Sequence, residues 1–371
     1  MAIWKIDELG EFVTLKRGYD LPQQKRKNGE IPIFSSSGVT GTHNEAMVEA
    51  PGVITGRYGT IGEVFFAETS FWPLNTTLYV ENFHENDEKF VYYFLKTFEW
   101  KKFASASAVP GINRNTVHKE IVRFPDFETQ QKIASVLSTI DKKIAVNKAI
   151  NDNLEQQAAT YFQELFINNA NPMWQISTIS DLGTVVGGST PSKTKPEYYT
   201  NNGIAWITPK DLSINKSKFI SHGENDITEL GLKNSSATVM PKGTVLFSSR
   251  APIGYIAIAS NEVTTNQGFK SVIPYSEIGT AFVYFFLKHS LPVIESAASG
   301  STFKEISGSA MKNIPAIIPD RNTLDQFNSF CAPIFAQQKI LEEQNHSLAM
   351  LRDSLLPKLM SGAIDIASIQ L

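Results

Sequence analysis

Apolar side chains recur at alternating steps of four and three residues between Thr129 and Phe166, a stretch without proline or glycine. This spacing places them on one face of a helix and is typical of a coiled-coil heptad. Two asparagines in the middle weaken such a seam, but they also favour one register because misaligned packing is penalised. The predicted seam contains Ile133, Leu137, Ile140, Ile144, Asn147, Asn151, Leu154, Ala158, Tyr161 and Leu165.

A second helix with the same spacing is predicted near the C-terminus, and its start carries a capping-box pattern, Thr323 followed by Gln326. Two arrangements are open at this point: two separate amphipathic helices on separate cores, or one long antiparallel pair. The duplication described next favours the pair. The second seam contains Phe327, Phe330, Ile334, Gln337, Leu341, Gln344, Leu348, Leu351 and Leu355.

The chain is an internal repeat, because five segments of its first half recur in the same order roughly 190 residues later. Five ordered matches indicate a duplication, which predicts a globular domain at 1–128, a helix at 129–168, a second domain at 169–322 and a second helix at 323–371. The matched segments begin at Trp4 and Trp174, Gly56 and Ser249, Asn75 and Asn266, Phe90 and Phe282, and Pro125 and Pro319.

Each globular domain is predicted to be mixed α/β. Short β-rich runs, such as 52–55 and 64–67 in the first copy, are separated by glycine and proline turns, and one amphipathic helix follows near 90–103. The second copy has matching runs and a helix near 281–297. The predicted architecture is therefore two duplicated α/β domains joined by two long helices that form an antiparallel coiled coil.

Composition narrows the class of protein. With 371 residues and 42% apolar residues, the chain is typical of a globular protein with more than one core. The first twelve residues lack a basic, apolar signal, and the longest apolar run, 281–287, is too short to span a bilayer. We therefore expect a cytoplasmic protein without a membrane partner.

Charge and cysteine content exclude further classes. A net charge of −3 argues against a strongly basic, non-specific nucleic-acid binder, although a specific binder can gather its Lys and Arg on one face. Cys331 is the only cysteine and lies on an apolar helix face, which indicates packing. The six histidines are scattered, so no metal site is expected.

Catalytic motifs are largely missing from the sequence. There is no phosphate-binding loop and no convincing dinucleotide motif, so we expect no cofactor in this chain. Asn171-Pro172-Met173-Trp174 weakly resembles a motif of amino-methyltransferases but lacks its second proline, and we interpret it as a linker. The pattern of Pro125-Asp126 with Asp141-Lys142-Lys143 resembles a nuclease metal site, but it falls on the predicted coiled coil and has no counterpart at 336–338.

The remaining candidate residues are ones that could bind a ligand. Gly56-Arg57-Tyr58-Gly59 is a glycine-flanked turn that presents a guanidinium beside an aromatic ring, and Ser248-Ser249-Arg250-Ala251-Pro252 is matched to it. Such an arginine suits bidentate contact with guanine or phosphate. A merely solvated hairpin arginine is the alternative, and the recurrence in both copies favours binding. Further candidates in loop-like surroundings are Lys16, Arg17, Lys25, Asn113, Arg114, Lys193, Lys195, Lys210 and Lys304.

Taken together, these features resemble the specificity subunit of type I restriction-modification enzymes. The similarity rests on the opening Trp4 to Gly10, the runs 31–43 and 56–62, Gln130-Gln131-Lys132-Ile133-Ala134, Asp141 to Ile144, and 355–362. The second copy departs from the first, with Phe327-Asn328 after Gln326 and the run 202–208 where 31–43 has its place. The difference implies two different DNA sequences for the two domains.

The resemblance implies a non-catalytic subunit in which each domain reads one half of a split, asymmetric DNA site. Two modification subunits are expected to dock on the helical region and to use S-adenosylmethionine, and restriction subunits to use ATP and Mg²⁺. A scaffold with two protein-binding domains is the alternative. A helix of about 36 residues spans roughly 54 Å, and successive major grooves on one face lie about 34 Å apart, so the helices are expected to set the spacer.

Overall fold

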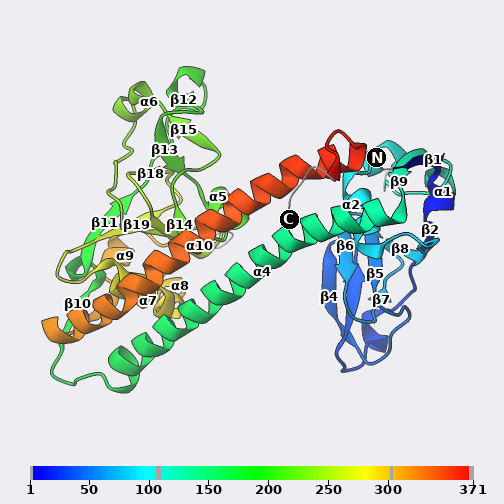
Figure 1. Ribbon diagram of the computed structural model, residues 1–371. Coiled ribbons are helices and arrows are strands. Elements are labelled where there is room, and N and C mark those ends of the chain that lie inside the picture. The colour runs from blue at the N-terminus through cyan, green and yellow to red at the C-terminus, as the bar shows by residue number, and fades with distance from the viewer. Residues whose placement is uncertain (1–2, 106–109, 301–303, 367–371) are drawn as a thin grey trace. The chain divides into compact units, whose positions relative to one another are not determined.

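The computed structural model describes residues 3–105, 110–300 and 304–366 (Figure 1). The chain forms two compact units. Unit 1 contains Met1–Ala145 and His346–Leu371, and unit 2 contains Val146–Asn345. Each unit therefore holds one globular domain together with part of both long helices.

Unit 1 is built on an antiparallel sheet in which β5 is buried at all five positions. A second, smaller sheet and a two-stranded ribbon complete its strands. The four-stranded sheet has the order β2 (Thr14–Arg17), β8 (Thr77–Asn82), β5 (Gly52–Gly56) and β6 (Val64–Ala67); the smaller sheet has β4 (Gly38–His43), β3 (Ile31–Ser35) and β7 (Trp72–Pro73); the ribbon pairs β1 (Trp4–Glu8) with β9 (Ile121–Pro125).

Three α-helices accompany these strands: α1 (Leu9–Phe12), α2 (Glu88–Thr97) and α3 (Arg114–Val117). Helix α2 begins after Asp87, whose carboxylate accepts the backbone N–H of Phe90 at 2.8 Å. Its apolar side chains, among them Phe90 and Phe94, pack into the main core of the unit with Phe12. The short 3₁₀ turns are η1 (Gln23–Lys25) and η2 (Trp100–Phe103).

Unit 2 repeats this plan with additional strands. Its larger sheet has the order β11 (Gly183–Gly187), β19 (Lys270–Pro274), β16 (Val245–Ser249), β17 (Ile253–Ala259) and β14 (Phe219–Ile220); the smaller has β12 (Tyr199–Thr200), β15 (Asn225–Ile227), β13 (Ile204–Ile207) and β18 (Thr264–Thr265); the ribbon pairs β10 (Gln175–Thr178) with β20 (Pro315–Ile318). Its helices are α5 (Pro209–Ile214), α6 (Glu229–Lys233), α7 (Thr280–His289), α8 (Leu291–Ser296) and α9 (Gly308–Lys312), with 3₁₀ turns η4 (Ile179–Asp181) and η5 (Pro196–Tyr198).

The duplication read from the sequence is present in the topology. The order β2, β8, β5, β6 corresponds to β11, β19, β16, β17, and in both units a ribbon strand follows directly on a short helix. The parallel pairing of β3 with β7 has a counterpart in β13 with β18, although the two segments differ in sequence. Backbone pairing, rather than side-chain identity, has been retained between the copies.

Both long helices begin directly after the aspartate of a Pro-Asp pair. Helix α4 covers Phe127–Gln163 and continues as a π-helical turn over Glu164–Asn168, and α10 covers Arg321–Ser361. Asp126 accepts the N–H of Thr129 at 3.0 Å, and Asp320 accepts that of Thr323 at 3.0 Å. These backbone donors lower the pKa of both carboxyls. The predicted cap at Thr323 was wrong, because Asp320 fills that role.

The helices pair in opposite directions, as predicted. In unit 1 Asp141 of α4 binds Arg352 of α10. In unit 2 Asn147 binds Asn345, and the ring of Tyr161 lies 6.0 Å from that of Phe327. Within unit 2, higher residue numbers on α4 thus meet lower numbers on α10, which defines an antiparallel pair.

The seam of α4 matches its prediction, while that of α10 is shifted by one residue at alternate positions. On α4, Ile133, Leu137, Ile140 and Asn147 are buried, and Ile144, Asn151 and Leu154 are half-buried. On α10, Ile334 and Leu341 are buried, and Leu348 and Leu355 are half-buried.

The predicted α10 seam positions Phe330, Gln337, Gln344 and Leu351 are exposed, and the residue after each is more buried. Two of them still contact α4, because the Phe330 ring lies 4.6 Å from that of Tyr161 and Gln344 accepts a hydrogen bond from Asn147 at 3.4 Å. At the other two positions the physical reason is polar pairing across the seam. The Gln338 amide donates to the backbone carbonyl of Asn151 at 3.1 Å, and Arg352 pairs with Asp141 at 2.7 Å. An apolar periodicity cannot reveal inward positions that are occupied by an amide and a guanidinium.

The residues of the nuclease-like pattern have structural roles. Asp126 caps α4, and Asp141 accepts hydrogen bonds from the Tyr93 hydroxyl at 2.6 Å and from Arg352. In the described part of the chain, no three His, Cys, Asp or Glu side chains are placed to hold a metal ion. No helix there is long and apolar enough to cross a membrane.

Candidate nucleic-acid interface

The turn that follows β5 holds an arginine against a neighbouring segment of unit 1. Arg57 Nε donates to the carbonyl of Ile112 at 3.2 Å, and its guanidinium lies 4.6 Å from the centre of the Tyr58 ring. Among residues 3–105, 110–300 and 304–366, no carboxylate forms an ion pair with Arg57. Its terminal N–H groups can therefore serve an external acceptor such as phosphate or a base edge.

A second part of this surface lies between β2 and α3. Asn113 caps α3 by accepting the N–H of Asn115 at 3.0 Å, and Arg114 Nη1 lies 3.5 Å from the Leu15 carbonyl. The neighbouring Lys16 binds Glu81 at 2.5 Å, and this hydrogen bond raises the pKa of the lysine. The structure thus brings Lys16 and Arg114 together, next to the segment that contacts Arg57.

The side chains of two other predicted cations of unit 1, Arg17 and Lys25, are not joined by hydrogen bonds or ion pairs among the described residues to Arg57 or Arg114. Arg17 lies at the end of β2 and pairs with Asp20 at 3.5 Å, with both side chains exposed. Lys25 is exposed at the end of η1, away from the hydrogen bonds that position Arg57 and Arg114 within the described residues. Lys25 therefore remains a prediction without structural support from its neighbours.

In unit 2 three predicted cations from three segments line one pocket. Lys193, Lys210 and Arg250 surround a cavity of about 490 Å³ that is also lined by Trp206 and Gln267. Lys210 binds Glu224 at 2.6 Å, which raises the pKa of the lysine. A concave surface with an amide and three cations has the chemistry for contact with phosphates or base edges.

The other predicted residues of unit 2 lie outside this lining. Lys195 donates to the Tyr198 hydroxyl at 3.1 Å, and Lys304 is exposed. Ser249 is completely buried, so its side chain cannot reach a ligand on the surface and we remove it from the candidate interface. The reason is its place as the last residue of β16, under the 304–306 segment that donates to its carbonyl.

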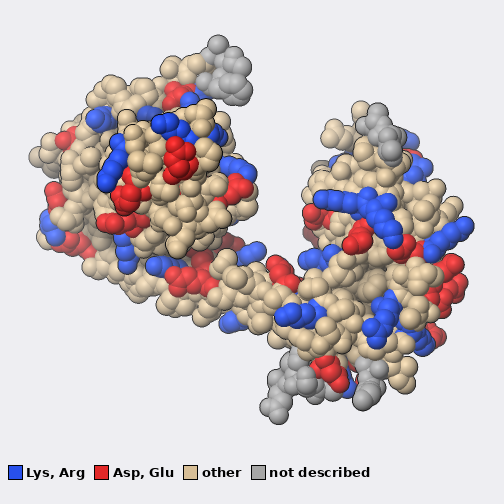
Figure 2. All heavy atoms as spheres, turned by 90° about the horizontal axis from the view of Figure 1, so that it is seen from above, with Lys and Arg blue, Asp and Glu red and all other residues tan. Residues whose placement is uncertain are grey.

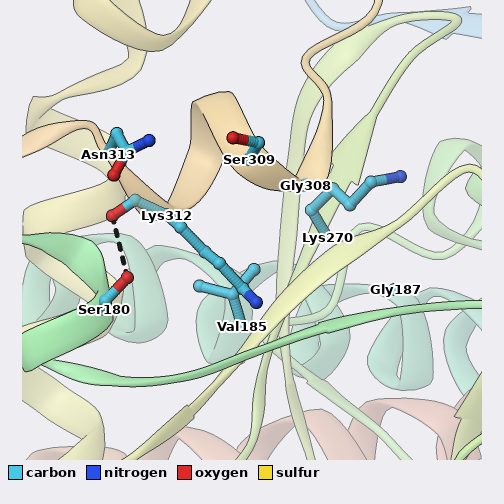
Figure 3. A pocket seen from close by; sticks show the side chains of 8 residues that line it. All are labelled: Ser180, Val185, Gly187, Lys270, Gly308, Ser309, Lys312 and Asn313. Carbon is cyan, nitrogen blue, oxygen red and sulfur yellow. Dashed lines mark hydrogen bonds between the residues drawn. The ribbon is translucent and has the colours of Figure 1, made fainter.

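A second pocket of unit 2 contains cations that the sequence did not single out. Lys270 and Lys312 line a cavity of about 540 Å³ together with Val185, Gly187 and the start of α9 (Figure 3). Lys270 opens β19, and a lysine in a buried strand is a signal that could have been noticed. Its ammonium lies 3.6 Å from Glu305, which also pairs with Arg250.

The two glycine- or serine-flanked arginines do not occupy equivalent positions. The N–H of Gly18 bonds to Thr77 and that of Gly188 to Phe269, so residue 77 corresponds to residue 269. With this alignment of the two units, the β-bridge of Tyr58 with Gly111 corresponds to the β-bridge of Arg250 with Glu305. Arg57 therefore corresponds to the buried Ser249, and the sequence match of Arg57 with Arg250 was off by one residue.

Charge on the surface is mixed rather than segregated. Lys and Arg lie among Asp and Glu on the face of each unit that Figure 2 shows. Several candidate cations form an ion pair with a carboxylate, including Lys16, Lys210 and Arg250. This agrees with the net charge of −3 and favours local contacts over a broad basic surface.

The fold and these surfaces define a duplicated α/β protein with two long helices, in which both copies carry surfaces that contain Lys and Arg. A family model described as type I restriction modification DNA specificity domain matches residues 1–156 and again residues 171–345. The chain belongs to this family.

Individual relatives agree with this membership. The MjaIX specificity subunit of a type I restriction enzyme from Methanocaldococcus jannaschii is 43% identical over 162 residues, which are 43% of this chain and 37% of that protein. The HindI specificity subunit from Haemophilus influenzae is 24% identical over 330 residues, 69% of this chain and 71% of that protein. The matched part thus spans little more than a third of the first relative.

A solved structure has the same fold. The crystal structure of an S subunit of a type I restriction-modification system from M. genitalium superimposes with a TM-score of 0.65 at 17% identity and covers 96% of both chains. At this identity the likeness concerns the fold.

Proposed function

We propose that this chain is the non-catalytic specificity subunit of a type I restriction-modification complex and binds double-stranded DNA in a sequence-specific manner. Each unit reads one half of a bipartite, asymmetric site. The observation that carries the proposal is the pair of different polar surfaces on one duplicated frame, Arg57 with Tyr58 in unit 1 and Arg250 with Lys193 and Lys210 in unit 2. Tyr58 and Arg250 hold equivalent positions in the two copies, and different side chains at one position suit two different half-sites.

The long helices supply the second part of the proposed function. They hold the two reading units at a separation that corresponds to the unread spacer, and modification subunits dock on the helical region. In this proposal the modification subunits use S-adenosylmethionine and the restriction subunits use ATP and Mg²⁺. This chain itself holds no cofactor. Asn147 with Asn345, and Asp141 with Arg352, support a fixed register because polar pairs in a seam disfavour slippage.

Salt dependence of DNA binding tests the proposal against the alternative of a protein-binding scaffold. A reader that neutralises several phosphates loses affinity steeply as salt rises, with a log-log slope of about −0.9 per phosphate contact. We expect such a slope for the full chain with a short duplex, measured by fluorescence anisotropy. A scaffold would form no salt-sensitive DNA complex.

Mapping of methylated sites tests the sequence-specific part. Cells that express this chain with its modification subunit should carry methyl groups at one split motif. The matched control is the same cell with the modification subunit alone. Methylation without this chain, or methylation by this chain alone with S-adenosylmethionine, would contradict the assignment.

A further inference from the structure

One carboxylate in unit 2 faces two cations of the candidate interface. Glu305 lies 3.3 Å from Arg250 and 3.6 Å from Lys270, with its two oxygens divided between them. The side chains of Arg250 and Glu305 are each about a third exposed (37% and 36%), whereas that of Lys270 is largely covered (15%). Arg250 and Glu305 therefore stand at the surface beside the largely covered Lys270, and the charges of all three groups are partly neutralised.

The backbone fixes this carboxylate in place. Residues Arg250 and Glu305 form a β-bridge, Glu305 bonds to Ser299 in both directions, and the N–H of Ile306 donates to Ser249 at 3.1 Å. Glu305 is thus held beside Arg250 by main-chain bonds on both sides. The fold therefore fixes the backbone positions of the two residues, and their side chains complete the ion pair.

Unit 1 has none of the three charges at the equivalent positions. Tyr58 stands where unit 2 has Arg250, Leu78 where it has Lys270, and Gly111 where it has Glu305. All three positions differ together, which is what a functional set predicts. The same frame presents an aromatic ring in one unit and a cation–carboxylate–cation group in the other.

We propose, on the basis of the proposed DNA-binding function, that Glu305 masks Arg250 and Lys270 against phosphates of unrelated DNA. While the carboxylate occupies both cations, fewer counterions are released on contact with a sequence-independent backbone. A target half-site replaces Glu305 as the partner of Arg250 through guanine or correctly placed phosphate oxygens. Glu305 is therefore a specificity-determining residue of unit 2.

The test compares Glu305→Gln with the unchanged chain on a random-sequence duplex, by anisotropy over a series of salt concentrations. The isosteric amide keeps the main-chain bonds but removes the charge. Binding should become at least about threefold tighter at low salt, and the log-log slope should steepen by about one to two. In the Arg250→Gln, Lys270→Gln background the effect of Glu305→Gln should disappear.

Glu68→Gln is the matched control, because Glu68 also pairs with a lysine, Lys89 at 3.1 Å, and its loss changes net charge equally. This variant should leave the slope unchanged. Equal binding by Glu305→Gln and the unchanged chain would overturn the mask while the proposed function stands. Weaker binding by Glu305→Gln would show that the carboxylate itself contacts DNA and would also overturn the mask. No binding by either protein at any salt concentration would overturn both proposals.

Discussion

Lys218 and Glu155 form a buried ion pair that joins the globular part of unit 2 to helix α4. Lys218 is 6% exposed at its side chain and donates to Gln338 of α10 at 2.6 Å, while Lys288 and the Tyr284 hydroxyl bind the other oxygen of Glu155. Burial lowers the pKa of Lys218. Burial alone would raise the pKa of Glu155, but Lys218 and Lys288 hold it below its ordinary value.

Removing one partner of this ion pair should lower the free energy of unfolding more than removing both partners. Lys218→Met leaves Glu155 with less compensation in a buried site, and we expect a loss of about 3 kcal/mol in the free energy of unfolding. The double variant Lys218→Met, Glu155→Leu should recover part of that loss. Urea unfolding monitored in unit 2 measures both. A single variant as stable as the unchanged chain would contradict a structural role for the pair.

Arg57→Ala and Arg250→Ala should act on different half-sites. If each guanidinium contacts a base, each substitution should weaken recognition of its own half by about 1 to 3 kcal/mol and leave the other half unchanged. Methylation of a target library by the complex with its modification subunit measures this. Lys89→Ala is a suitable control, because Lys89 pairs with Glu68 and is not among the candidate DNA-binding residues. Equal losses on every sequence would identify phosphate contacts instead.

Unit 1 should lose stability as the pH falls below neutrality. Burial, assisted by Arg114 and His84, lowers the pKa of His118, whose Nε2 accepts the N–H of Leu15 at 2.9 Å. The unfolded chain therefore binds the proton first, so this contribution is present above the unfolded value near 6.5 and declines as pH falls towards the folded pKa.

Urea midpoints of unit 1 at pH 7.5 and pH 5.5 measure this decline. In His118→Gln the amide oxygen can accept the Leu15 N–H without titrating, so the difference between the two pH values should shrink. An unchanged difference in that variant would assign the pH dependence to other groups.

Four residues inserted after Lys148 should lengthen the unread spacer. The insertion adds about 6 Å and slightly more than one helical turn, so the units should move apart with modest rotation. We expect one or two additional base pairs between unchanged half-sites, read from the methylated motif. The same insertion after Asn234, at the end of α6, is the control and should leave the spacer alone. Altered bases with an unchanged spacer would show that the helices do not set the distance.

The sequence predicted the large features of this fold because they depend on periodicity. The seam of α4, the antiparallel pairing and the duplication all follow from apolar spacing and repeated segments. The candidate site was predicted less well, because its geometry depends on backbone register. Arg57 and Arg250 align in the sequence repeat, yet the main-chain pairing makes Arg250 the equivalent of Tyr58, and Ser249, the equivalent of Arg57, is buried.

Other features of the site lay beyond sequence comparison for a similar reason. Glu305 becomes meaningful only when the fold brings it to Arg250, 55 residues away. Gln338 faces the seam because Asn151 offers it a carbonyl, which no apolar pattern indicates. The orientation of these side chains depends on polar partners that are close in space but distant in sequence, so the local sequence does not reveal it.

The closing residues of α10 belong to the core of unit 1, where Leu356, Leu359 and Met360 pack with Leu137 of α4. Arg123 also donates to the Ser361 carbonyl at 3.3 Å. During translation the ribosome delivers these residues after all of unit 2, which is one uninterrupted stretch. The domain that is synthesised first is therefore completed last, and a nascent chain released before Leu356 exposes an unfinished apolar core to chaperones and proteases.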